Sequence, residues 1–131
     1  MNECKFKSVC PILKNNIKTT NSIYVIGDLH ADYKKTIELF RHFKLIDRNK
    51  KWIGKNSIVV QLGDQIDGYG RGNYEDAHGE IQILDFFDDI HIQAQSYGGA
   101  VYSLIGNHEL MNVMGNFSYA SKKDIEESGG I

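Results

Sequence analysis

The chain has 131 residues and a formal net charge of −2, and 41% of its residues are hydrophobic. This length allows one domain at most, and the apolar content is enough for a packed core. The slightly acidic balance provides no basic field for a phosphate backbone and excludes general nucleic-acid binding. Cys4 and Cys10 are too few for a disulfide scaffold or a four-thiolate zinc site, and we expect a reducing, cytoplasmic compartment.

The amino-terminal stretch differs in character from the rest of the chain. Pro11 and the Asn15-Asn16 pair favour an irregular arm over residues 1–21, so the folded domain is expected over residues 22–131. No apolar run reaches the 18 residues of a membrane span, and the arm lacks the continuous hydrophobic stretch of a signal peptide. We therefore expect a soluble protein that does not enter a membrane.

Three short apolar runs alternate with two amphipathic segments. Strands are expected at Ile23–Ile26, at Ile58–Leu62 and in the run that begins at Val101. The second run is apolar throughout, which is typical of a strand covered on both faces. Helices are expected at 33–43 and from 80 to about 96. This order predicts two right-handed crossovers and an α/β fold with a parallel βαβαβ sheet.

Local signals define the ends and faces of the helices. Asp32 is placed to cap the first helix, and the Gly98-Gly99 pair is placed to stop the second. Met111 and Met114 stand at helical spacing and are expected in the core. The second helix is expected to bury one row of side chains, namely Ile81, Leu84, Phe87 and Ile90.

A polar cluster follows each expected strand. The three clusters read Gly27-Asp28-Leu29-His30, Gly63-Asp64-Gln65-Ile66-Asp67 and Gly106-Asn107-His108-Glu109. Taken singly, an aspartate or asparagine after a glycine is a common turn residue. Because the carboxyl ends of parallel strands meet at one edge of a sheet, however, the three clusters are expected to converge on one crevice.

The side chains of these clusters suit metal-assisted chemistry. Carboxylates, imidazoles and an amide oxygen around one crevice match Mn²⁺, Fe²⁺ or Zn²⁺. A pair of such ions activates a water and clamps the oxygens of a displacement at phosphorus. His108 is placed to protonate the leaving oxygen and Asp67 to orient His108, while Glu109 is expected to brace the site through hydrogen bonds.

The three clusters resemble the first three signature motifs of the calcineurin-like metallophosphoesterases, in the order of that family. The stretch Gly98 to Ser121 is most similar to the Shewanella-like protein phosphatases, a branch of the serine/threonine phosphatases. The resemblance covers about Ile23 to Tyr119. It implies an αββα sandwich, of which this sequence supplies the incomplete amino-terminal part, and hydrolysis of a phosphate monoester on a phosphorylated substrate.

The resemblance also implies roles for single residues. His108 and Asp67 would form the acid pair, and two divalent metals would activate the water. The implied metal ligands are Asp28 and His30 for the first ion, Asp64 as the bridge, and Asn107 for the second ion.

Two features of the family are missing. The family completes its second metal site with two histidines far downstream, and this sequence ends before either of them. Protein phosphatases of the family also usually have an arginine that grips the phosphate directly after the residue matching Asp67, and here that position is Gly68. Arg71, in the loop that follows, is a weak candidate for binding the substrate phosphate in its place.

Two alternatives stay open at the level of sequence. The first keeps the chemistry and changes the substrate to a nucleotide or dinucleoside polyphosphate, because the missing arginine weakens the phosphoprotein assignment. The second is a truncated, inactive domain that acts as a binding module or survives as a gene fragment. Metal identity and oligomeric state are not determined by the sequence.

Overall fold

The computed structural model describes residues 17–68 and 79–129. Most of the expected arm and the candidate Arg71 lie outside the described residues. One sheet holds three parallel strands in the order β1 (Ile23–Ile26), β2 (Ile58–Gln61) and β3 (Ala100–Ser103). The register pairs Ile26 with Gln61 and Gln61 with Ser103, so all three strands end at one level. The predicted α/β fold with a parallel sheet is confirmed.

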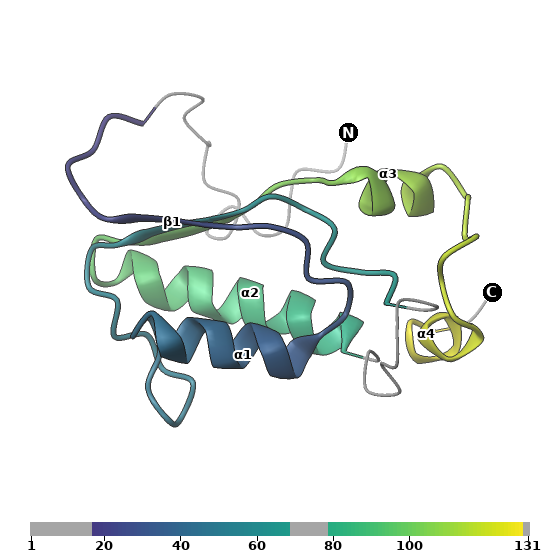
Figure 1. The fold of residues 1–131 in the computed structure, drawn as a ribbon, viewed down its shortest axis with the longest axis horizontal. Coiled ribbons are helices and arrows are strands. Elements are labelled where there is room, and N and C mark those ends of the chain that lie inside the picture. Colours follow the sequence, from purple (N-terminus) through teal and green to yellow (C-terminus); the bar gives the residue numbers. More distant parts are fainter. Residues whose placement is uncertain (1–16, 69–78, 130–131) are drawn as a thin grey trace, which may run out of the picture.

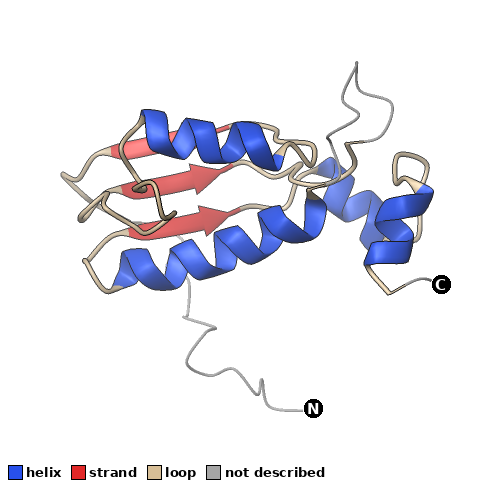
Figure 2. Cartoon of the chain, turned by 90° about the horizontal axis from the view of Figure 1, so that it is seen from below, coloured by secondary structure: helices blue, strands red, loops and turns tan. Residues whose placement is uncertain are grey.

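Helices α1 (Tyr33–His42) and α2 (Glu80–Gln95) lie on the same face of the sheet, as two successive crossovers of one hand require (Figure 1). The strand arrows all point toward the end of the molecule that holds α3 (Asn107–Val113) and α4 (Lys122–Glu127) (Figure 2). The described residues thus form one sheet layer and one helix layer. These correspond to half of the sandwich that the resemblance implies.

The ends of the two long helices follow the expected local signals. Asp32 is the N-cap of α1, and its Oδ1 accepts a hydrogen bond from Lys35 N at 2.8 Å. Past the end of α2, Gly98 has a φ of 73°, and Gly99 N donates to Ala94 O at 3.0 Å. The left-handed glycine closes the last turn and sends the chain into β3.

The hydrophobic core lies between the sheet and the two helices. Phe40 of α1 meets Phe86 and Phe87 of α2, with ring centroids 5.0 and 5.6 Å apart and interplanar angles of 86° and 84°. These edge-to-face contacts are favourable for aromatic pairs, and they lock the two helices together. The sheet contributes Ile26, Val59 and Val101 to the same cluster.

Three expectations about burial are wrong. On α2, Ile81 and Leu84 are each 41% exposed, because the helix is rotated so that its paired phenylalanines face α1. Met114 caps the end of α3 and is 76% exposed, because α3 projects beyond the sheet (Figure 1). The second run, expected to be covered on both faces, has helices on only one face within the described residues, and its Val60 is half-buried while Leu62 is 48% exposed. In the described residues, no helix is both long and apolar enough to cross a membrane.

Candidate active site

The loops that follow the strands are tied together by backbone hydrogen bonds. Asp64 O accepts from both Leu29 N and His30 N at 2.9 Å, and Gln65 O accepts from Ala31 N at 2.8 Å. These bonds join the cluster after β1 to the cluster after β2. The expected convergence at the carboxyl ends of the strands therefore has a direct structural basis.

The loops after β2 and β3 approach each other so closely that glycine is required on both. A Cβ atom on Gly106 would lie 2.5 Å from Asp64 N, and one on Gly63 would lie 2.5 Å from Gly106 Cα. Gly63 also has a φ of 97°, which disfavours any residue with a side chain. The two glycines let Asp64 and His108 come from different strands into one small volume.

Three residues of the site have left-handed backbone conformations. The φ angles are 43° at His30, 55° at Asp64 and 61° at Asp67. A residue with a side chain costs roughly 1–2 kcal/mol in this region, so the surrounding structure has to enforce it. Asp67 N donates to Glu80 Oε1 at 2.7 Å, which anchors the third of these strained turns to the start of α2.

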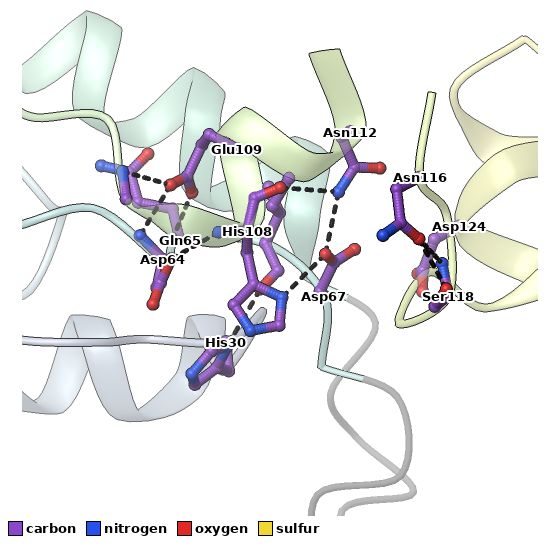
Figure 3. A network of polar contacts seen from close by, with 12 residues as sticks. His30, Asp64, Gln65, Asp67, His108, Glu109, Asn112, Asn116, Ser118 and Asp124 are labelled. Carbon is purple, nitrogen blue, oxygen red and sulfur yellow. Dashed lines mark hydrogen bonds and ion pairs between the residues drawn. The ribbon is translucent and has the colours of Figure 1, made fainter. Parts of the chain in front are cut away.

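Glu109 anchors the second strained turn (Figure 3). Its Oε2 accepts hydrogen bonds from Asp64 N and from Gly106 N, both at 2.8 Å, and its Oε1 accepts one from Gln65 N at 2.7 Å. One carboxylate thus satisfies three backbone donors from two loops. The expectation that Glu109 braces the site is confirmed by these bonds.

The two imidazoles are oriented by acceptors on their Nδ1 atoms. His30 Nδ1 lies 3.2 Å from Ile66 O, and His108 Nδ1 lies 2.9 Å from Asp67 Oδ2. Because a carbonyl oxygen or a carboxylate can only accept, each Nδ1 carries the proton and each Nε2 is the basic nitrogen. The rings meet edge to face with centroids 4.9 Å apart, and Tyr119 packs on His108 with centroids 5.0 Å apart.

Nitrogen and oxygen donors of three residues lie close together at the two imidazoles. His30, Asp64 and His108 each offer one ligand atom, and these atoms all lie within 4.8 Å of one another. Asp64 Oδ1 also accepts a hydrogen bond from His108 N at 2.8 Å, which fixes the position of the Asp64 carboxylate relative to the backbone that carries the His108 imidazole. The imidazole of His30 and the carboxylate of Asp64 are donors suited to divalent ions of borderline hardness and fit such an ion, and the imidazole of His108 lies beside the same centre.

The remaining predicted residues lie around this centre. Asp28 Oδ2 is 3.5 Å from His30 Nε2, and the Asp28 side chain is 62% exposed at the rim. Asp67 is 1% exposed and lies on the Nδ1 side of the His108 ring (Figure 3). Asn107 is the first residue of α3, beside His108, and its side chain is exposed. The structure therefore groups Asp28 and Asp67 with the donor centre, and Asn107 stands next to His108 with an exposed side chain.

Two residues that position the site were not singled out from the sequence. Gln61 is fully buried, and its Oε1 accepts from Gly63 N at 3.0 Å and from Gln65 Nε2 at 2.8 Å. A glutamine that ends an otherwise apolar strand was the available signal. Asn112 donates to Asp67 Oδ2 at 2.8 Å, a contact that no sequence pattern indicated.

An α/β sheet whose strand ends bring imidazoles and carboxylates to one edge is an architecture typical of metal-dependent hydrolases. A family model described as calcineurin-like phosphoesterase matches residues 22–130. The chain belongs to the calcineurin-like phosphoesterase family, as the three motifs indicated. Membership in this metallophosphoesterase family implies divalent metals at the site.

Relatives and solved structures agree with this family. The chain is 37% identical over 116 residues to Shewanella-like protein phosphatase 2 of Arabidopsis thaliana, which covers 88% of the chain and 28% of that protein. It is 39% identical over 112 residues to Shewanella-like protein phosphatase 1 of Plasmodium berghei, covering 86% and 29%. The crystal structure of a cold-active protein-tyrosine phosphatase from a psychrophilic Shewanella species superposes with a TM-score of 0.70 at 25% identity, covering 83% of this chain and 31% of that one. The chain thus spans about a third or less of the length of each.

Proposed function

We propose that the chain forms the site of a metal-dependent phosphoesterase that hydrolyses phosphate monoesters. The observation that carries this proposal is the grouping of His30, Asp64 and His108, whose donor atoms lie within 4.8 Å of one another at the carboxyl ends of three parallel strands. His108 is backed by the buried Asp67 at 2.9 Å. A metal-binding edge beside an oriented imidazole is the combination that hydrolysis at phosphorus needs.

Two divalent ions are part of the proposal. Asp28, His30 and Asp64 would hold the first ion, and Asp64 with Asn107 would hold the second. Manganese, iron and zinc all match this mixture of nitrogen and oxygen donors, and manganese is the ion to try first. When bound, the ions supply Lewis-acid chemistry that makes water nucleophilic at neutral pH and stabilises charge on the phosphoryl group.

His108 is the proposed proton donor to the leaving oxygen. Its Nδ1 donates to Asp67, so transfer takes place from Nε2, which lies on the side of the ring that faces His30 (Figure 3). Asp67 holds the ring in one orientation and stabilises the imidazolium from which the proton leaves. Glu109 keeps the Asp64 turn in place during this step but does not itself exchange protons.

The proposed substrate is a phosphorylated protein. The two relatives are named protein phosphatases, and the matched crystal structure is titled a protein-tyrosine phosphatase. These names favour a phosphatase over a nucleotide or dinucleoside polyphosphate hydrolase and over an inactive module. Gly68 provides no guanidinium for the phosphate, so the choice between phosphoserine and phosphotyrosine is left to kinetics. The cytoplasmic location expected from the cysteine content stays a prediction.

The test uses the full 131-residue chain with added Mn²⁺ and p-nitrophenyl phosphate, followed by phosphoserine and phosphotyrosine peptides and diadenosine tetraphosphate. His108→Asn should lower kcat by about a hundredfold or more, because general acid catalysis contributes roughly 10²–10⁴. His42→Asn is the matched control, since His42 is an exposed residue at the end of α1. Full turnover in His108→Asn, or an equal loss in both variants, would contradict the proposed role.

A further inference from the structure

The two oxygens of the Asp67 carboxylate have different surroundings. Oδ2 accepts from His108 Nδ1 at 2.9 Å and from Asn112 Nδ2 at 2.8 Å. In the part of the chain that the structure describes, the buried Oδ1 has no hydrogen-bond partner. The rotation of the carboxylate is therefore set by two donors that meet at a single oxygen, and one of these donors is not the imidazole.

Asn112 is itself fixed by two acceptors. Its Nδ2 donates to Asp67 Oδ2 and, at 3.0 Å, to the backbone oxygen of His108. The amide group has two hydrogens, so both are used. Asn112 stands one helical turn after His108 on α3. The same helix therefore carries both the imidazole and the amide that bonds to Asp67, the partner of that imidazole (Figure 3).

We propose that Asn112 is a positioning residue that holds Asp67 in the rotation in which Oδ2 accepts the proton of His108 Nδ1. Without this amide, the buried carboxylate is held by the imidazole alone and can rotate out of the plane in which its oxygen meets Nδ1. The hydrogen bond to Nδ1 then weakens, and the imidazole loses its fixed orientation and its preference for one tautomer, because the group bonded to one ring nitrogen decides which nitrogen is protonated. The catalytic consequence rests on the proposed function, whereas the structural consequence does not.

Two variants separate the hydrogen bonds from the packing. Asn112→Leu removes both donors at similar volume, and a cavity of about 240 Å³ beside Asn112 gives the new side chain room. Asn112→Asp keeps the shape and, at an alkaline pH where both carboxylates are ionised, replaces the donors with a second negative charge opposite Asp67. Asn116→Leu is the matched control, since Asn116 is an exposed loop residue that bonds to Ser118.

The first measurement is the long-range ¹H–¹⁵N spectrum of the ¹⁵N-labelled, metal-free chain at one fixed alkaline pH. The unsubstituted chain and Asn116→Leu should show His108 with a protonated Nδ1 and an unprotonated Nε2. Both Asn112 variants should show a mixture of tautomers at His108 and no change at His91. The second measurement is turnover of p-nitrophenyl phosphate with Mn²⁺, where kcat should fall about tenfold in both variants with KM within about twofold of the original.

The outcomes are distinct. An unchanged His108 tautomer in Asn112→Leu and Asn112→Asp would overturn the positioning role, and so would unchanged kcat in a chain that turns over substrate. If the unsubstituted chain has no turnover while the tautomer shifts in both variants, the proposed function fails and the positioning role stands. Should the leucine variant not fold, the aspartate variant, which preserves the shape of the side chain, decides the question.

Discussion

Replacing Glu109 by glutamine is expected to loosen the strained turn that carries Asp64. The carboxylate accepts three backbone hydrogen bonds, two on Oε2 and one on Oε1, at 2.7 to 2.8 Å. Glutamine keeps only one acceptor oxygen, and its amide nitrogen must then face a backbone donor. At least one of the three bonds is lost, and the others no longer involve a charged acceptor.

The expected cost follows from these bonds. A hydrogen bond to a charged group contributes about 1.5–3 kcal/mol and a neutral one about half of that. Glu109→Gln loses one of these bonds and weakens the other two. Because Glu109 is half-buried, solvent reduces the loss, and we expect the free energy of unfolding to fall by about 2–3 kcal/mol. Asp64 has a strained φ of 55°, so its backbone should relax once these bonds are lost. The Asp64 carboxylate should then move away from the other donor atoms of the site, and the affinity for Mn²⁺ or Zn²⁺ should fall about tenfold or more.

Urea unfolding followed by circular dichroism measures the first effect, and isothermal titration calorimetry with Zn²⁺ measures the second. Glu126→Gln is the matched control, since the Glu126 side chain is 66% exposed and its contact with Lys122 is 3.8 Å long. This surface change should stay within about 0.5 kcal/mol. If Glu109→Gln behaves like the control in both assays, the three hydrogen bonds do not hold the site, and the reasoning is wrong.

Further predictions concern the close approach of the loops and the helix cap. Gly106→Ala should lower the free energy of unfolding by about 1–3 kcal/mol and weaken Zn²⁺ binding, because its Cβ would lie 2.5 Å from Asp64 N. Gly27→Ala, where a Cβ would meet nothing within 4 Å, should change neither quantity by a comparable amount in the same urea and calorimetric experiments. Asp32→Ala removes the cap bond to Lys35 N and should cost about 1 kcal/mol in urea unfolding without altering metal affinity; a loss of metal binding would mean that α1 positions His30.

The amino-acid sequence determined the order of the elements and the place of the site. Apolar runs of strand length alternate with helical periods, and each run ends in a glycine followed by polar side chains. Parallel strands joined by crossovers must end on the same side, so this local pattern was enough to bring Asp28, Asp64 and His108 to one edge. The cap at Asp32 was equally local and equally predictable.

The faces of the helices were less predictable. Apolar residues stand on two adjacent rows of α2, and the buried row is the one that includes Phe86 and Phe87, which pack on Phe40, so Ile81 and Leu84 are left 41% exposed. Hydrophobic periodicity specifies that a helix has an apolar side. It does not specify which of two adjacent rows meets a partner that comes from a distant part of the chain.

The supporting contacts of the site were decided by tertiary structure alone. Glu109 reaches backbone donors 44 and 45 positions away, and Asn112 reaches Asp67 across a similar separation. Hydrogen bonds of this kind depend on the distance and angle between atoms of different loops, and no spacing along one segment encodes them. Sequence therefore supplied the chemical groups and their meeting place, while the folded chain fixed which nitrogen of each imidazole carries a proton and which acceptor holds it there, the backbone oxygen of Ile66 for His30 and the carboxylate of Asp67 for His108.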